Sequence, residues 1–120
     1  MISQTAGRSA VTVTSGAAVA MLSVDTADPA TAVGVALARA FSFALILTAT
    51  QDVNVRVYAA VGPNCGLTLV TGWNGTATSA APYQNFTSAT PITRIYVTAQ
   101  ATGADAVVNC DFVAQSSAVL

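Results

Sequence analysis

Apolar and polar residues alternate most clearly between residues 41 and 61. Every second residue from 41 to 47 is apolar, and so is every second residue from 53 to 61, with the polar pair Gln51-Asp52 between the two runs. A period of two is typical of a β-strand that buries one face. The pattern therefore predicts a hairpin of two strands. Because an isolated hairpin is not stable in water, the other strands should supply a second apolar layer and complete a sandwich.

Shorter runs of the same kind occur along the rest of the chain, separated by turns rich in Gly, Pro, Asn and Asp. Ser15-Gly16 predicts a second hairpin turn, and Asn74-Gly75 is the dipeptide most favoured in a type I′ hairpin turn. Residues 102–105 turn the chain once more. The predicted strands are residues 10–14, 18–24, 41–47, 53–61, 67–73, 83–87, 92–101 and 106–114, with residues 76–78 starting back beside 67–73.

Three segments fall outside this clear alternation. Residues 31–40 are ambiguous, because Asp28-Pro29 has the form of a helix start whereas apolar residues alternate from 33 to 37. We favour an extended edge segment there, with room for one helical turn. Residues 1–9, which are polar and turn-like, and residues 115–120 are expected to be loose arms.

Seven or eight short strands joined by tight turns predict an all-β fold, an antiparallel β-sandwich of jelly-roll type. With 120 residues, the chain is expected to form one domain, residues 1–120, long enough to bury a single core. In the last two strands the pattern directs six side chains toward that core: Ile95, Val97, Ala99, Val108, Cys110 and Phe112.

The chain carries unusually few charges. Only 8% of its residues are charged, all of them Asp or Arg, where soluble domains average about 25%. A surface made of Ser, Thr, Asn, Gln and Ala favours extensive contact with other protein; the alternative is a secreted domain with a neutral surface. A net charge of −1 gives no electrostatic footprint for nucleic acid or for an anionic membrane. The most apolar run, residues 41–47, is far shorter than the roughly 20 residues that span a bilayer.

The residue types restrict the chemistry that the chain can perform. Histidine and lysine are absent, which excludes Ser-His-Asp, Cys-His and Schiff-base catalysis within one chain and disfavours a structural zinc site. Acid and base catalysis would depend on the pair Asp105 and Asp111 or the pair Asp25 and Asp28, which are better explained as solvated turn residues. We predict no enzyme, no cofactor and no metal. The N-terminus lacks a signal-peptide pattern, so either synthesis for the cytoplasm or export by another route is expected.

Cys65 and Cys110 are the only cysteines. Two small, buried, free thiols are favoured in a protein made in the cytoplasm. The alternative is one disulfide, which would close a loop of about 45 residues and stabilise the fold by about 4 kcal/mol.

Trp73, Tyr83 and Phe86 lie in a stretch, residues 57–93, that contains no charge. Trp and Tyr are enriched both in sugar-stacking platforms and at the centres of protein interfaces. Three interpretations remain open: the three rings close one end of the core, form a protein interface, or form a carbohydrate site.

Arg56 and Arg94 each interrupt a strong strand on its outward face. If the two strands are neighbours, Asp52 or Asp111 could pair with them in a surface ion pair worth up to about 1 kcal/mol. The simpler interpretation is that both are solvated, and the functional one is that they bind the carboxylates of a partner.

The second half of the chain resembles a pattern met in small structural proteins of tailed-phage virions. The resemblance rests on TQDVNVRV followed by a strand that carries Trp, and on PITRIYVTA followed by the turn TGA and a last strand; it covers about two thirds of the chain. Its pattern is similar to that of capsid decoration, or cement, proteins. The resemblance implies a β-sandwich or jelly roll that binds the major capsid protein on the virion surface as a trimer or dimer and stabilises the shell. It transfers no residue-specific role.

The sequence therefore predicts a non-enzymatic virion protein, a capsid decoration protein of a bacteriophage that is assembled in the host cytoplasm. The candidate interface residues are Trp73, Tyr83, Phe86, Arg56 and Arg94. The alternative is a carbohydrate-binding β-sandwich that uses Trp73 and Tyr83. A hydrolase that works through aspartates is a third and less favoured interpretation.

Overall fold

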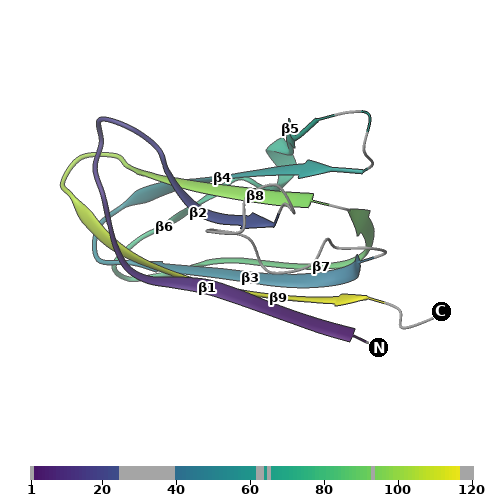
Figure 1. Ribbon diagram of the computed structural model, residues 1–120. Coiled ribbons are helices and arrows are strands. Elements are labelled where there is room, and N and C mark those ends of the chain that lie inside the picture. Colours follow the sequence, from purple (N-terminus) through teal and green to yellow (C-terminus); the bar gives the residue numbers. More distant parts are fainter. Residues whose placement is uncertain (1, 25–39, 62–63, 65, 93, 117–120) are drawn as a thin grey trace.

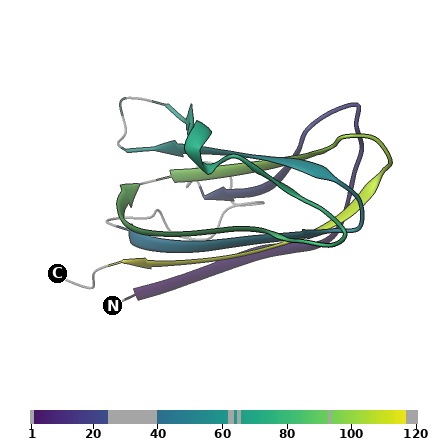
Figure 2. The ribbon, with the colours of Figure 1, turned by 180° about the vertical axis from the view of Figure 1, so that it is seen from behind.

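The computed structural model describes residues 2–24, 40–61, 64, 66–92 and 94–116, which form two β-sheets packed face to face (Figure 1). Sheet A has the strand order β1-β9-β3-β7, and its strands are β1 (Ile2–Val13), β9 (Ala106–Ser116), β3 (Ala40–Ala49) and β7 (Tyr83–Ile92). Sheet B has the order β2-β8-β4 followed by two short strands, and its strands are β2 (Val19–Val24), β8 (Arg94–Ala101), β4 (Val53–Ala60), β5 (Thr68–Leu69) and β6 (Gly75–Ala77). Seen from behind, the 3-10 helix Thr71–Trp73 lies beside β4 at the border of sheet B (Figure 2).

The connectivity is that of a jelly roll. From β1 to β4, and again from β7 to β9, each strand lies in the sheet opposite to the strand before it. All strand pairs are antiparallel. β5 and β6 both pair with β4, so they share one position in the strand order. The predicted all-β sandwich is confirmed, although the strands of sheet A, at 10 to 12 residues, are longer than expected.

The predicted hairpins are wrong. β3 pairs with β7 and β9, and β4 pairs with β5, β6 and β8, so the turn at Gln51-Asp52 leads from one sheet to the other. The turns after β1 and after β8 also change sheets. A period of two shows which side of a strand is buried, but two strands have the same period whether they lie side by side or face to face. Placing β3 opposite β4 lets their apolar faces cover each other.

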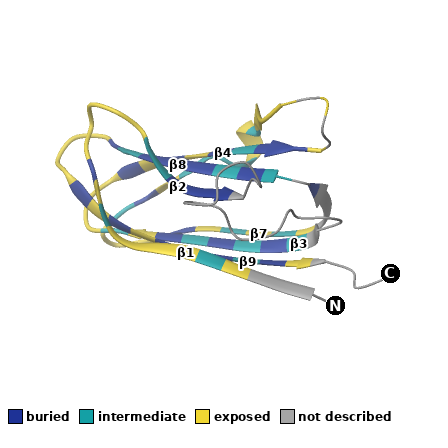
Figure 3. Cartoon of the chain, in the orientation of Figure 1, coloured by how far each residue is buried: buried dark blue, intermediate teal, exposed yellow. Residues whose placement is uncertain are grey.

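The core lies between the sheets, where buried residues alternate with exposed or half-buried ones along β3, β9 and most of β4 (Figure 3). Phe43 packs against Phe112 with 5.9 Å between the ring centroids. The inward orientation predicted for the last two strands is confirmed, because all six side chains are buried: Ile95, Val97, Ala99, Val108, Cys110 and Phe112. Within the described residues, no helix is long and apolar enough to cross a membrane.

The N-terminal segment differs from the loose arm expected for residues 1–9. It pairs with β9 from Ile2 opposite Ser116 to Arg8 opposite Cys110. This edge strand shows little alternation because Val13 is the only buried one among its described side chains. It contacts β9 closely, since a Cβ atom at Gly7 would lie 2.5 Å from the carbonyl oxygen of Cys110. Gln115 and Ser116, expected in the second arm, also belong to β9. Residues 117–120 and the ambiguous segment 31–39 lie outside the described residues.

A bulge interrupts β1 between Arg8 and Val11. Ala10 has a positive φ of 54° there, and its backbone N–H donates to Oδ1 of Asn109 at 2.8 Å. Left-handed backbone is unfavourable for a residue with a Cβ atom. The side chain of Asn109 therefore stabilises the bulge by satisfying the amide that the ladder leaves unpaired.

The type I′ turn predicted at Asn74-Gly75 is also wrong. Asn74 has φ −71° and ψ 152°, which is extended backbone, and Gly75 begins β6. On the edge of β4 away from β8, Val57 lies between β5 and β6 and faces neither strand, yet both of its backbone polar groups are bonded. Its N–H donates to Oδ1 of Asn74 at 3.1 Å, and its carbonyl accepts from the N–H of Val70 at 2.9 Å. The predicted strand 67–73 thus shortens to β5 because the helical turn and one side chain satisfy the edge of β4.

Candidate protein interface

The three candidate aromatic residues do not form one surface. Tyr83 is only 6% exposed, and its hydroxyl donates to the carbonyl oxygen of Trp73 at 2.6 Å. Trp73 is half-buried and packs edge-on against Phe43, with 5.1 Å between the ring centroids. Phe86, by contrast, is 67% exposed. Since the buried ring of Tyr83 has no free face to stack on a sugar, the carbohydrate platform of Trp73 and Tyr83 is wrong.

Polar groups on the inward face of β7 support Tyr83. Asn85 donates from Nδ2 to the Tyr83 hydroxyl at 3.1 Å, and Thr87 donates from its hydroxyl to Oδ1 of Asn85 at 2.6 Å. Burial raises the pKa of the Tyr83 phenol, while the hydrogen bond from Asn85 lowers it. Tyr83 is thus a structural residue at the border of the core.

The outward face of sheet A is the surface that carries Phe86. The strand register places Thr5, Val113, Ala44 and Phe86 in one row across the four strands. The next row is Gly7, Asp111, Ile46 and Gln84. We call the two rows together the sheet A face.

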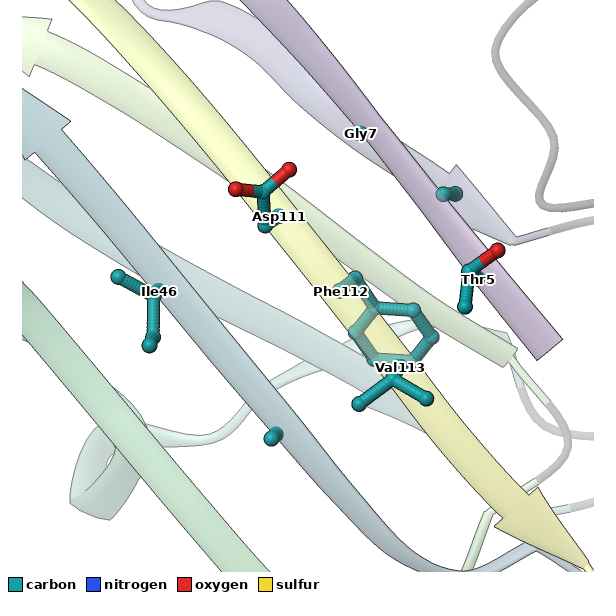
Figure 4. Close-up of a pocket in the computed structure, with 8 residues that line it drawn as sticks. Thr5, Gly7, Ile46, Asp111, Phe112 and Val113 are labelled. Atoms are coloured by element: carbon teal, nitrogen blue, oxygen red, sulfur yellow. The ribbon is translucent and has the colours of Figure 1, made fainter. Parts of the chain in front are cut away.

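The sheet A face is shallow and almost free of charge. Figure 4 shows Thr5 on β1, Asp111 and Val113 on β9, and Ile46 on β3, around a depression of about 530 Å³. Gly7 and Ala44 also line it and contribute almost no side chain. Among the described residues that face outward from β9, β3 and β7, Asp111 is the only charged one. A flat, neutral, partly apolar sheet face suits contact with another protein surface.

The outward face of sheet B carries both candidate arginines. Tyr58 lies opposite Tyr96, with 5.7 Å between the ring centroids. Arg56 lies opposite Thr98 on one side of this pair, and Arg94 lies opposite Ala60 on the other. The condition set for these arginines, that their two strands be neighbours, is met. We call Arg56, Tyr58, Arg94 and Tyr96 the Tyr/Arg face.

The predicted acidic partners do not match this arrangement. Asp111 lies on the sheet A face, on the opposite side of the sandwich, so it cannot pair with either arginine. Asp52 lies in the turn before β4, and within the described chain it forms no ion pair with Arg56.

The aspartate pairs provide no catalytic site in the described chain. Asp105 lies in the turn before β9 and Asp111 in the middle of that strand, about 20 Å apart along an extended chain, beyond the roughly 5 to 10 Å of a glycosidase pair. Asp25 and Asp28 lie outside the described residues. The described part of the chain contains no group of three or more side chains that could hold a metal ion.

Cys110 is a buried, free thiol that is 1% exposed, as the favoured prediction has it; Cys65 lies outside the described residues. Burial raises the pKa of the Cys110 thiol from 9.0 to about 12. The carboxylate of Asp111 contributes to this rise, and the guanidinium of Arg8 opposes it.

The raised pKa of Cys110 predicts a loss of stability in alkali. The unfolded thiol ionises near pH 9, whereas the folded thiol keeps its proton to about pH 12, so the unfolded state gains stability as the pH rises through this interval. Between pH 8 and pH 10 the free energy of unfolding should fall by about 1 kcal/mol more in the wild type than in Cys110→Ala. Urea denaturation at each pH measures both, and the comparison cancels the other titrating groups. Equal pH dependence in the two proteins would contradict the burial of the thiol.

Comparisons with known proteins give one distant match. No family model matches the sequence, and no curated protein matches it. Among solved structures, the chain is similar to a chain in the structure of infectious bursal disease virus, Gt strain, with a TM-score of 0.40 and 13% identity. The match covers 97% of this chain but only 32% of that one, so the chain spans about a third of the length of the protein it resembles. A likeness of this size does not assign a function.

Sequence reasoning missed most of the residues on these two faces. Ile46 and Val113 are apolar residues at outward positions of their strands, and this breach of alternation was the available signal. Tyr58 and Tyr96 are separated by 38 positions in the sequence, and only the pairing of β4 with β8 brings their rings together.

Proposed function

We propose that the chain is a non-enzymatic structural protein of a virion, a decoration protein that binds the major capsid protein and stabilises the shell as a homo-oligomer. The observation that carries the proposal is the sheet A face, which combines exposed apolar groups with a single charge. A monomer in solution gains nothing from such a surface, whereas burial against protein removes its apolar groups from water.

The outward side of sheet A, which carries the sheet A face, is large enough for this role. Its four strands of about ten residues span roughly 33 Å by about 19 Å. This area is comparable to the ~800 Å² that each partner contributes to a standard interface. Phe86 supplies the exposed aromatic group that often anchors such a contact. Repetition around a shell adds avidity, so each single contact can be weak.

The resemblance of PITRIYVTA and its flanking strands to tailed-phage decoration proteins supports the choice of a capsid as the partner. The low charge of the whole chain points the same way, since a surface poor in charge is expected to meet protein. The protein would act on the outer surface of the capsid after assembly in the host cytoplasm, as a trimer or dimer.

Two measurements test the proposal. Light scattering gives the mass of the purified chain, and co-sedimentation measures its binding to shells assembled from the major capsid protein of the same virus. We expect a dimer or trimer that pellets with the shells. A monomer at every concentration that stays in the supernatant would refute the proposal.

Replacing Phe86 by alanine should weaken binding to the capsid shells about 30-fold. This is the loss expected when an aromatic anchor of an interface is removed. The fold should be preserved because the side chain is 67% exposed. Gln84→Ala, on the same face and strand, is the matched control and should change binding less than threefold. Quantitative co-sedimentation measures both variants. Equal binding by Phe86→Ala and the wild type would remove the sheet A face from the contact.

A further inference from the structure

The acidic residues of the described loops gather at one end of the sandwich. Asp52 lies in the turn between β3 and β4, and Asp105 lies in the turn between β8 and β9; both are exposed. The two turns are joined, because Thr102 donates from its backbone N–H to the carbonyl oxygen of Asp52 at 3.1 Å. A further bond, from the N–H of Ala101 to the carbonyl oxygen of Thr14 at 3.1 Å, ties the β1–β2 turn to the same end. None of these three described turns contains a basic residue. We call Asp52 and Asp105 with their turns the acidic end.

The Tyr/Arg face has the opposite charge. Arg56 and Arg94 lie on either side of the Tyr58–Tyr96 pair, and within the described outward residues of sheet B there is no acid. Arginine binds carboxylates through paired hydrogen bonds, and both arginine and tyrosine are enriched at the centres of protein interfaces. This face therefore suits a partner that presents carboxylates on a narrow, exposed surface.

The acidic end of a second copy has that chemistry. It presents two exposed carboxylates on turns held together by backbone hydrogen bonds, and the face presents two guanidinium groups. Contact between the two would place the exposed acids of one copy against the arginine-bearing face of the next. Because it joins two different surfaces, a bound pair still has one free Tyr/Arg face and one free acidic end.

We propose that the acidic end of one copy docks on the Tyr/Arg face of the next. This contact is heterologous, so it extends copies into a ring or an open array rather than closing a two-fold dimer. The inference rests on the proposed self-association and adds a second contact to the sheet A face. Such a contact would link neighbouring copies on the shell.

The test uses four chains that all carry Phe86→Ala, which weakens the sheet A contact and leaves the proposed one. The parent has no other change. The acidic-end variant adds Asp52→Asn and Asp105→Asn, and the face variant adds Arg56→Gln and Arg94→Gln. Because Arg94 makes a further interaction, Arg56→Gln alone serves as a milder face variant. Circular dichroism checks that each chain is folded, and sedimentation velocity measures its mass at low and high salt.

We expect the parent to self-associate as its concentration rises at low salt and to dissociate at high salt. Each variant alone should self-associate at least tenfold more weakly than the parent. An equimolar mixture of the two variants should form a 1:1 complex that does not grow. The acidic-end variant keeps only its Tyr/Arg face and the face variant keeps only its acidic end, so one contact forms and no further one can follow. A symmetric contact would not behave in this way.

Three results would overturn the inference: a parent that stays monomeric, variants that assemble like the parent, or a mixture that does not associate. These results are distinguishable from failure of the proposed function. That failure would appear in the wild type, which would neither self-associate nor pellet with capsid shells. A wild type that pellets with shells while the parent stays monomeric would overturn only the contact between the acidic end and the Tyr/Arg face.

Discussion

Replacing Leu45 by alanine is expected to lower the free energy of unfolding by about 3 kcal/mol. Leu45 is fully buried in the middle of β3, one of the two central strands of sheet A. Its shortened side chain would leave a cavity that strands paired on both sides cannot close by moving. Total stability is typically about 5 to 15 kcal/mol for a domain, so the loss should be evident in a urea denaturation curve.

Ile46→Ala is the matched control for this experiment. Ile46 is the next residue on the same strand, but it faces outward and lines the shallow depression of the sheet A face. Its truncation should reduce the stability of the monomer by less than about 1 kcal/mol. Similar losses for the two variants would mean that β3 does not bury one face and expose the other.

Gly75→Ala is expected to lower the free energy of unfolding by about 2 kcal/mol, because the new methyl group would overpack the border of the core. A Cβ atom at Gly75 would lie 2.8 Å from Cδ2 and 2.9 Å from Cε2 of Tyr83. The ring has little freedom to move away, since it is buried and its hydroxyl is bonded to the carbonyl oxygen of Trp73. The expected result is a lower midpoint of urea denaturation.

Gly72→Ala controls for the general effect of replacing glycine. Gly72 lies in the adjacent 3-10 helix, and a Cβ atom there would meet no other atom within 4 Å. This variant should have nearly unchanged stability. A second test combines Gly75→Ala with Tyr83→Leu, which removes part of the ring. If the two changes are simply additive, the contact between Gly75 and Tyr83 is not the cause of the loss.

The candidate site was predicted only in part from the sequence. The outward positions of Arg56 and Arg94 were predicted from the alternation of apolar residues. That their two strands are neighbours was stated only as a condition, which the structure meets. The structure does not contain the joint surface considered for Trp73, Tyr83 and Phe86. Phe86 and Tyr83 are three residues apart in one strand, and therefore lie on opposite faces of it. Their clustering in the sequence had no bearing on their clustering in space.

Apolar alternation by itself determined the all-β class and the buried side of the strongest strands, because a strand with one face in a core must place apolar residues at every second position. The inward residues from Ile95 to Ala99 and from Val108 to Phe112 illustrate this. The edge strand β1 escaped detection, since close backbone contact at Gly7 and pairing with β9 stabilise it without a regular apolar face.

Only the tertiary structure decided which strand lies beside which. β1 pairs with β9 from the opposite end of the chain, and β3 pairs with β7 and β9 rather than with β4. Neighbouring strands are joined by backbone hydrogen bonds, which every residue except proline can donate, so no local pattern specifies the partner. The choice is made by the packing of two whole apolar faces against each other. The same choice creates the sheet A face and the Tyr/Arg face, because both consist of residues that come together only when distant strands pair.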